Sequence, residues 1–167
     1  MKDHRSRVVE EFTICFIVTS DSVYRGEKID EIKPIFNDIE IYCSKAKKGI
    51  YTVVPNDRKI IEETAKEFLG QCDVIIVTGG TGLSKKDISV DVIRSMAIKD
   101  VPGIGEIFRY LSYRDIGIYS YISRTGGYVV NNSFIVVVPG NPRAVELMIK
   151  EILCHIAPHV VYELRYT

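Results

Sequence analysis

One segment in the middle of the chain joins a buried-strand pattern to a glycine-rich turn. The segment is VIIVTGGTGLSKKD, Val74 to Asp87. Its first four residues are β-branched and apolar without polar alternation, which predicts a strand covered on both faces, as in a parallel sheet between helices. Gly79, Gly80 and Gly82 lack Cβ atoms, so backbone N–H groups can approach an anion closely here. The segment therefore predicts an anion-binding turn at a strand end.

The end of this segment predicts a helix start. Asp87 is expected to cap a helix from Ile88 to about Ile98, whose N-terminal dipole would add to the attraction for anions. The segment is not a Walker loop, because Lys85 and Lys86 are followed by an aspartate. It also lacks the GxGxxG spacing of a dinucleotide fingerprint. A short glycine turn can also merely reverse the chain, so the motif alone leaves both interpretations open.

Length, charge and cysteine spacing limit the class of protein. The 167 residues are 46% hydrophobic, which fits one domain over residues 1–167. Lysine plus arginine equals aspartate plus glutamate at 22 each, so no global field favours nucleic acid. The polar start and the lack of any apolar run near about 18 residues predict a cytoplasmic protein without a membrane partner. The dispersed cysteines are expected to be reduced, buried thiols; they are Cys15, Cys43, Cys72 and Cys154.

Apolar periodicity predicts strands that alternate with helices. The predicted strands cover 12–19, 50–54, 74–77, 116–122, 128–130 and 134–138. The predicted helices cover about 30–44, 57–69, 88–98, a stretch ending near 112, and the chain after 142, with Pro158 as a kink or break. This alternation is typical of a three-layer α/β/α domain with a mostly parallel sheet.

Loops that follow parallel strands gather at one sheet edge, where ligands bind. The loops in question are 20–28, 55–57, 79–87 and 139–143. They contribute cations, namely Arg25, Lys85, Lys86 and Arg143, and carboxylates, namely Asp21, Asp57, Asp87 and Asp91. Phosphates bound with a divalent cation require this mixture of positive groups and hard oxygen ligands.

Five motifs follow one another along the chain, namely SDSVYRGEKID (20–30), TGGTGLSKKDISVD (78–91), PGIGEIFR (102–109), SRTGG (123–127) and VPGNP (138–142). In this order they resemble the molybdenum cofactor biosynthesis family of MogA and MoaB, which also includes the molybdopterin-binding domains of gephyrin-like proteins. Together they span nearly the whole chain. The resemblance implies the MogA/MoaB-like molybdopterin-binding fold.

The resemblance also implies an activity and an assembly. Such a protein is a homotrimer, which can pair into a hexamer, and it binds molybdopterin and ATP. As a molybdopterin adenylyltransferase, a nucleotidyltransferase, it uses ATP and Mg²⁺ to adenylylate the terminal phosphate of molybdopterin. Contact with a molybdate-inserting protein is a further expectation.

The resemblance assigns roles to particular residues. Asp87 would hold or orient Mg²⁺, the GGTG amides would bind phosphate, and the loop from Pro139 to Pro142 would shape the pterin side of the site. Ser123 and Arg124 match the family's Ser-Arg motif and are expected to contact a ligand. The implied substrate-binding residues are Ser20, Asp21, Thr78, Gly79, Gly80, Thr81, Gly82, Ser123, Arg124, Pro139, Gly140, Asn141 and Pro142.

Two departures from the family pattern affect these expectations. The residues after RGEKID lack the usual glycine turn, which leaves the start of the first helix open. The family's VPDD-type segment, whose first aspartate is regarded as catalytic, is Val54-Pro55-Asn56-Asp57 here. The amide of Asn56 cannot accept a proton and binds Mg²⁺ more weakly than a carboxylate. Asp57 could substitute only if the turn places it one residue over.

The catalytic candidates are therefore Asp87 together with Asn56 or Asp57, and more than one function fits them. The first is molybdopterin adenylyltransferase. The second is a catalytically silent family member that binds a pterin or nucleotide, or serves in assembly. A third, hydrolysis of nucleotide phosphates on the same fold, occurs in competence-damage-type relatives.

Several of these residues also have purely structural explanations. Asp87 could serve only as an N-cap, and Lys85 and Lys86 could belong to a solvated loop. Glu106 and Arg109, one helical turn apart, are expected to form a surface or subunit-contact pair. Packing or an oligomer interface explains the tyrosines in the middle of the chain; these are Tyr110, Tyr113, Tyr119, Tyr121 and Tyr128.

Overall fold

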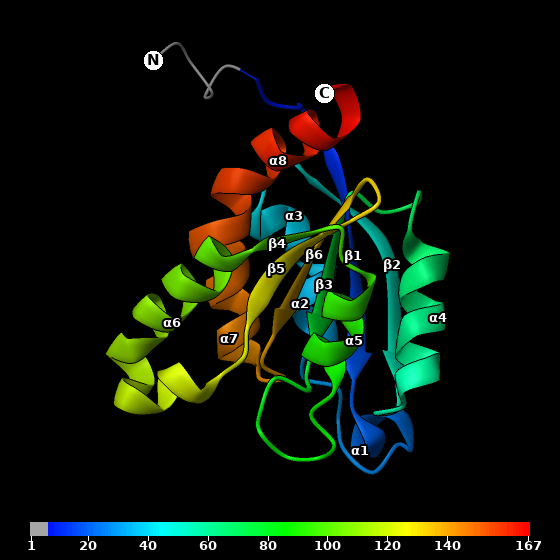
Figure 1. Cartoon of the computed structure of the whole chain (residues 1–167), viewed down its shortest axis with the longest axis vertical. Coiled ribbons are helices and arrows are strands. Elements are labelled where there is room, and N and C mark those ends of the chain that lie inside the picture. Colours follow the sequence, from blue (N-terminus) through cyan, green and yellow to red (C-terminus); the bar gives the residue numbers. More distant parts are fainter. Residues whose placement is uncertain (1–6) are drawn as a thin grey trace.

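The computed structural model describes residues 7–167 and contains one six-stranded sheet in the order β2-β1-β3-β6-β5-β4 (Figure 1). The strands are β1 (Phe12–Thr19), β2 (Ala46–Val54), β3 (Val74–Thr78), β4 (Lys99–Val101), β5 (Gly126–Val130) and β6 (Ser133–Val138). The four strands β2, β1, β3 and β6 are parallel, and β5 and β4 form the antiparallel part at one edge. The prediction of a mostly parallel sheet is confirmed.

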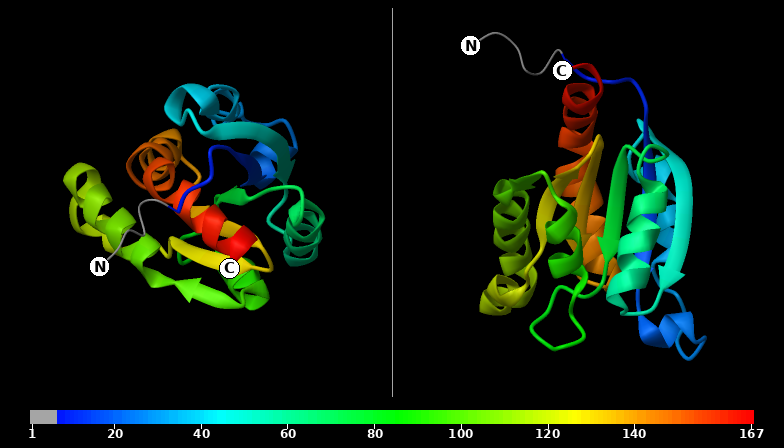
Figure 2. Two further views of the ribbon diagram at one scale, coloured as in Figure 1. Left: turned by 90° about the horizontal axis from the view of Figure 1, so that it is seen from above. Right: turned by 45° about the vertical axis from the view of Figure 1, so that its right-hand side comes forward.

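Helices cover both faces of this sheet, which gives the expected three layers (Figure 2). They are α1 (Asp21–Tyr24), α2 (Lys33–Asn37), α3 (Ile39–Tyr42), α4 (Arg58–Phe68), α5 (Ser89–Met96), α6 (Pro102–Ile116), the 3₁₀ helix η2 (Gly117–Ile122), α7 (Pro142–Leu147), the π-helical η3 (Met148–Leu153) and α8 (Cys154–Tyr166). In the described part of the chain, no helix combines the length and apolar character needed to cross a membrane.

Alternate residues of the central strands contribute side chains to two hydrophobic cores, one on each face of the sheet, because successive side chains in a strand point to opposite faces. On β3, Val74 and Ile76 belong to the core under α2, α3, α6, α7, η3 and α8. Ile75 and Val77 belong to the core under α4 and α5. All four side chains are fully buried, which explains the continuous apolar run in the sequence.

Three predicted elements differ from the structure. Residues 117–122 form η2 rather than a strand, because Gly117, at φ 60°, ends α6 and the chain continues as a 3₁₀ turn. The edge strand is β4 instead. The helix expected over 30–44 is split into α2 and α3 at Asp38, and it starts at Lys33 with Pro34 in its first turn. Pro158 lies inside α8 without ending it.

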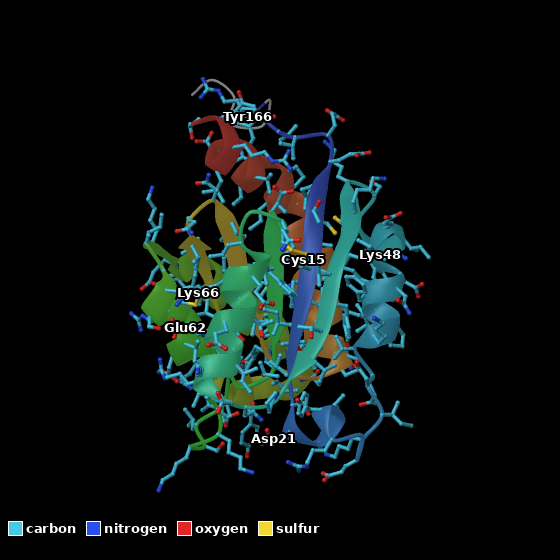
Figure 3. All side chains as sticks on the ribbon, turned by 90° about the vertical axis from the view of Figure 1, so that its right-hand side faces the viewer. Cys15, Asp21, Lys48, Glu62, Lys66 and Tyr166 are labelled. Carbon is cyan, nitrogen blue, oxygen red and sulfur yellow. A yellow bond between two sulfur atoms is a disulfide. The ribbon has the colours of Figure 1, made fainter. Side chains whose placement is uncertain are left out.

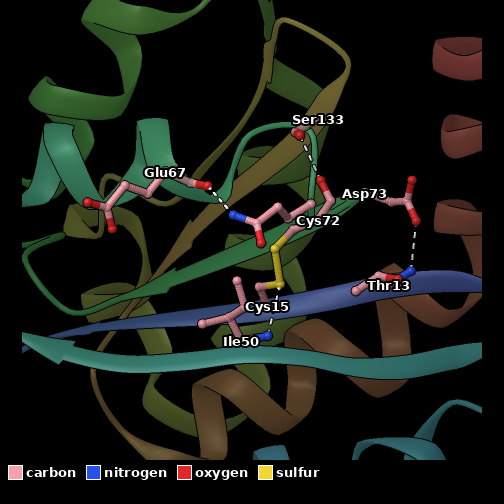
Figure 4. Close-up of a disulfide and its surroundings, with 8 residues drawn as sticks. Thr13, Cys15, Ile50, Glu67, Cys72, Asp73 and Ser133 are labelled. Carbon is pink, nitrogen blue, oxygen red and sulfur yellow. Dashed lines mark hydrogen bonds between the residues drawn. A yellow bond between two sulfur atoms is a disulfide. The ribbon is translucent and has the colours of Figure 1, made fainter.

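The expectation that all four cysteines are reduced is wrong for one pair. Cys15 of β1 and Cys72, two residues before β3, form a disulfide, whereas Cys43 and Cys154 are free thiols (Figure 4). The two bonded cysteines lie 57 positions apart, and only the parallel pairing of β1 with β3 brings them together. Their spacing therefore carried no signal in the sequence.

The neighbouring strand β2 makes room for this disulfide. A Cβ atom on Gly49 would lie 2.5 Å from the Cys15 sulfur, a distance that atoms cannot reach without displacement. The N–H of Ile50 donates to the same sulfur at 3.2 Å. The β1–β2 register shifts at this place, between Ile14 and Phe16. A local irregularity and a glycine thus accommodate the bonded sulfur pair.

Replacing both bonded cysteines by serine is expected to lower the free energy of unfolding by about 2–4 kcal/mol, because the closed loop restricts the unfolded chain. Urea unfolding with and without a thiol reductant measures the effect. The wild type should lose stability in reductant and the double variant should not. The control is Cys154→Ser, which removes a free thiol and should keep the reductant sensitivity. A wild type that is equally stable in both conditions would contradict the prediction.

Candidate functional site

The loops that follow β1, β2, β3 and β6 lie at the same end of the molecule, at the bottom of Figure 1, as predicted. Asp21, in the first of these loops, lies at the end opposite Tyr166 near the C-terminus (Figure 3). This shared edge places the residues of three predicted motifs side by side: the SDS segment, the GGTG turn and the PGNP loop.

The GGTG turn needs its glycines for steric reasons. Gly79 and Gly80 have positive φ angles of 106° and 69°. A Cβ atom on Gly79 would lie 2.4 Å from the carbonyl oxygen of Thr19, and one on Gly80 would lie 2.4 Å from Ser89 Oγ. The N–H of Gly79 donates to the Val138 carbonyl at 2.9 Å. The turn is therefore fitted tightly between β1, β6 and the first turn of α5.

Asp87 closes the loop that follows the glycines. Its Oδ2 accepts a hydrogen bond from the Ser84 N–H at 2.9 Å, and its own N–H donates to the Ser84 carbonyl at 3.0 Å. The expectation that Asp87 caps the next helix is wrong, because α5 begins at Ser89 and Ile88 occupies the N-cap position. Within residues 7–167, Oδ1 of Asp87 has no hydrogen-bond donor.

Asn56 is paired with Asp21. The backbone N–H of Asn56 donates to Asp21 Oδ1 at 2.9 Å. Lys86 Nζ lies 3.9 Å from Asp21 Oδ2. The backbone hydrogen bond from Asn56 is the largest cause that lowers the pKa of Asp21. Thus a neutral amide side chain stands next to Asp21 at the position where the family pattern has an aspartate.

Three further predicted residues serve as helix caps. Asp57 Oδ1 accepts from the Ile60 N–H at 3.0 Å and caps α4, which separates its role from that of Asn56. Asn141 Oδ1 accepts from the Ala144 N–H at 2.9 Å and caps α7, with Pro142 in the first turn. Ser20 caps the short α1 through its Oγ. These side chains fix how the chain leaves the strand ends.

Ser123 and Arg124 come from the segment before β5. Ser123 Oγ lies 2.9 Å from Thr125 Oγ1. The guanidinium group of Arg124 hydrogen-bonds to the carbonyl groups of Gly82 and Asp87 and to the carboxylate of Asp91. Arg124 thus contacts the predicted phosphate loop, and it does so through hydrogen bonds to protein carbonyl and carboxylate groups.

Two cavities flank the Pro139–Pro142 loop. One, of about 200 Å³, is lined by Ser20, Thr78 and Gly140 together with residues of the 28–32 segment. The other, of about 80 Å³, is mainly apolar and includes Phe108 and Leu147. Their positions make the loop a partition between two hollows at the candidate site.

The smaller cavity contains an unusual polar group. Ser120 is only 1% exposed, and its Oγ has no hydrogen-bond partner among the described residues. An unpaired buried hydroxyl costs free energy, so such a group is typical of a place that a ligand or water fills. Arg143 and Asp115, which form an ion pair with a shortest distance of 2.5 Å, also line this cavity.

The oxygen ligands at the strand ends would suit a magnesium ion that is also bound by a substrate. No cluster of three or more histidine, cysteine or acidic side chains that could hold a metal occurs among residues 7–167. Mg²⁺ is commonly bound by only one or two carboxylates plus substrate phosphates and waters. Asp87 can supply one such carboxylate, because among the described residues no protein group donates to its Oδ1.

The protein is thus a three-layer α/β domain. The loops at the carboxyl ends of its parallel strands contain a glycine turn and a carboxylate, and they border two cavities. The family model described as probable molybdopterin binding domain matches residues 15–159. The chain therefore belongs to the molybdopterin-binding family of MogA and MoaB, as the motifs predicted.

Relatives in sequence and structure agree with this assignment. Molybdenum cofactor biosynthesis protein B of Staphylococcus aureus (strain Mu50 / ATCC 700699) is 36% identical over 116 residues, which are 68% of this chain and 69% of that protein. The tungsten cofactor synthesizing protein MoaB of Pyrococcus furiosus superimposes with a TM-score of 0.85 at 25% identity, over 94% of this chain and 99% of that one. A MogA structure superimposes with a TM-score of 0.79 at 22% identity over 91% and 99% of the two chains, which shows the shared fold.

Proposed function

We propose that this protein is a molybdopterin adenylyltransferase, which uses ATP and Mg²⁺ to attach AMP to the terminal phosphate of molybdopterin. The observation that carries the proposal is the glycine turn at 79–82 packed against the Asp87 carboxylate at the ends of parallel strands. Backbone amides in such a turn suit phosphate oxygens, and a carboxylate suits the accompanying cation. Family membership supports the pterin as the second substrate.

The chemistry joins two polyanions. An oxygen of the terminal phosphate of molybdopterin attacks the α-phosphorus of ATP, a new P–O bond forms, and the bond to pyrophosphate breaks as pyrophosphate leaves. The protein contributes chiefly positioning and charge neutralisation. Lys86 and the loop amides would neutralise phosphate charge, and Asp87 would hold or orient Mg²⁺. Bound Mg²⁺ would neutralise further charge on the phosphates.

The partition formed by the Pro139–Pro142 loop supports a division of the substrate between two cavities. The larger cavity, beside Ser20 and Thr78, is polar enough for phosphates. The smaller cavity offers apolar walls and the unpaired Ser120 hydroxyl, which suit a flat heterocycle with a hydrogen-bonding edge. On this proposal the pterin lies on the Ser120 side, and the product would pass to a molybdate-inserting protein.

One observation favours a second candidate function, a family member that binds these ligands without turnover. The side chain at the position that the family resemblance associates with catalysis is the neutral amide of Asn56 in place of a carboxylate. A protein of this kind would retain the phosphate loop and both cavities.

One assay separates the two candidates. Purified protein is incubated with molybdopterin, Mg²⁺ and ATP labelled on the α-phosphate, and adenylylated pterin and released pyrophosphate are measured. The proposal predicts labelled pterin that depends on both substrates. Binding of molybdopterin by calorimetry without any labelled product would support the silent candidate and reject the transferase.

The α6–η2 surface supports an oligomer, and the family resemblance makes a trimer the expected form. Tyr110, Tyr113, Ile118, Tyr119 and Tyr121 are all more than half exposed, whereas Tyr128 is buried. Contiguous exposed apolar side chains of this kind mark interaction surfaces. We expect sedimentation equilibrium at micromolar concentration to give three times the monomer mass. Tyr119→Glu should shift that equilibrium towards monomer, and Tyr24→Glu, on another exposed tyrosine, should not. A wild type that sediments as a monomer would contradict the prediction.

A further inference from the structure

Arg124 holds three carbonyl groups of the loop at 79–87. Its backbone N–H donates to the Thr81 carbonyl at 3.0 Å. Its Nε donates to the Gly82 carbonyl at 3.0 Å, and its Nη2 donates to the Asp87 carbonyl at 2.5 Å. The three carbonyl groups lie on both sides of the turn that is closed by the hydrogen bonds between Ser84 and Asp87.

The rest of the guanidinium group is held by a carboxylate. Nη1 of Arg124 donates to Oδ1 and Oδ2 of Asp91 at 2.9 and 3.0 Å. Asp91 lies in the first turn of α5, and its hydrogen bond with Arg124 is the largest cause that lowers the pKa of its carboxyl group. Four hydrogen bonds thus use most of the five N–H donors of the guanidinium group. One N–H of Nη2 is left over, so a phosphate that bound the guanidinium group through two N–H groups would have to displace an existing partner.

A second arginine holds the backbone on which Arg124 sits. Nη1 of Arg109 donates to the carbonyl groups of Ser123 and Thr125 at 3.2 and 3.1 Å. A Cβ atom on Gly105 would lie 2.9 Å from both terminal nitrogens of Arg109, so this glycine leaves room for the guanidinium group. Arg109 is therefore not merely half of a surface pair with Glu106, as its spacing suggested.

The carbonyl contacts also set the direction of the loop amides. In a trans peptide the C=O and the following N–H point to opposite sides. Carbonyl groups of Thr81 and Gly82 directed towards Arg124 therefore turn the N–H groups of Gly82 and Leu83 to the other side of the loop. Backbone N–H groups aligned in this way are those that can bind an anion.

We propose that Arg124 and Arg109 form a two-arginine clasp that fixes the conformation of the 79–87 loop, and that both are positioning residues rather than ligands. The clasp joins the SRTGG and PGIGEIFR motifs to the GGTG motif in one structure. The inference rests on the proposed function only in regarding this loop as the phosphate-binding one.

The test measures amide hydrogen exchange in the ligand-free protein. The N–H groups of Ser84 and Asp87 are hydrogen-bonded only while the loop keeps its closed form. Arg124→Gln should raise their exchange rates roughly tenfold or more, because the loop opens more often. Arg124→Lys should restore little, since an ammonium group lacks the planar fork. Arg109→Gln should raise the same rates by a smaller factor, because it acts through the 123–125 segment.

The matched control is Arg165→Gln. Arg165 also makes a two-point contact with a carboxylate, donating to Asp73 at 3.0 and 2.6 Å, and its neighbour Tyr166 lies at the far end of the molecule (Figure 3). This variant should leave exchange at Ser84 and Asp87 unchanged. Equal rates in wild type and a folded Arg124→Gln would overturn the clasp. If Arg124→Gln does not fold, Asp91→Asn replaces it; unchanged rates in a folded Asp91→Asn would likewise overturn the proposal.

Binding of inorganic pyrophosphate separates positioning from direct contact. The clasp predicts that Arg124→Gln weakens pyrophosphate binding and speeds loop exchange together. Weaker binding with unchanged loop exchange would identify Arg124 as a direct ligand and overturn the proposal. Because loop exchange is measured without ATP or pterin, a failed adenylyl-transfer assay would reject the proposed function and leave the clasp test intact.

Discussion

Asp87→Asn is expected to reduce Mg²⁺-dependent adenylyl transfer by about a hundredfold or more, because losing a charged metal ligand removes several kcal/mol of transition-state stabilisation. The loop should keep its form, since an asparagine oxygen can still accept the Ser84 hydrogen bond. Initial rates over a range of Mg²⁺ concentrations measure the effect. The loss should persist at saturating ATP.

The control for Asp87→Asn is Asp57→Asn. Asp57 lies at the same sheet edge but caps α4, and asparagine is an equally good cap. Asp57→Asn should therefore keep both stability and rate. Unchanged kinetics in Asp87→Asn would reduce Asp87 to its loop-closing role and remove the proposed metal site.

Asn56→Asp is expected to raise adenylyl transfer about tenfold or more, or to create it in an inactive protein. A carboxylate at this position would stand beside Asp21 and give the cation a second acidic neighbour. A gain of about 1.4 kcal/mol in barrier height corresponds to a factor of ten. Rates for wild type and variant under one saturating Mg²⁺ and ATP condition decide the matter.

The same substitution has a cost in the absence of metal. It replaces a neutral amide next to Asp21 by a like charge, and when two carboxylates are adjacent the pKa of one of them rises. Thermal unfolding of Asn56→Asp should therefore respond more strongly to added Mg²⁺ than that of the wild type. If instead Asp57→Asn abolishes transfer while Asn56→Asp changes nothing, the catalytic carboxylate is Asp57 and the alignment of the Pro55 turn is wrong.

The architecture could be predicted from the sequence because its signals are local. The apolar runs at 74–77 and 134–138 each indicate a strand that is buried on both faces of the sheet, and the glycine and proline turns after them indicate where the strands end. The strand expected at 116–122 failed because exposed tyrosines and isoleucines imitate the alternation of a half-buried strand. In the structure Gly117 ends α6 with a positive φ, which the sequence does not specify, and the chain continues as the 3₁₀ helix η2.

The candidate site was less predictable, because its contacts join distant segments. Asp87 looked like a helix cap, yet its carboxylate bonds backwards to Ser84. Arg124 looked like a ligand contact, yet the partners of its side chain lie 33 to 42 positions earlier in the chain. A basic residue two positions before a glycine pair does not indicate in the sequence which carbonyl groups it will contact in the fold.

The tight fit of the GGTG turn has a consequence for how relatives of this protein can diverge. At the centre of the edge, backbone meets backbone: a Cβ atom on Gly140 would lie 3.2 Å from Gly79 Cα, and one on Gly79 would reach the Thr19 carbonyl. A larger residue at Gly79 would collide with this backbone, and one at Gly140 would force it to shift by a few tenths of an ångström, so substitution can hardly reshape the middle of the edge. Differences in ligand selectivity between relatives must then come from residues at the periphery of the site. Lys28 and Arg143 are such residues, because each lines one of the two cavities and can be replaced by other side chains.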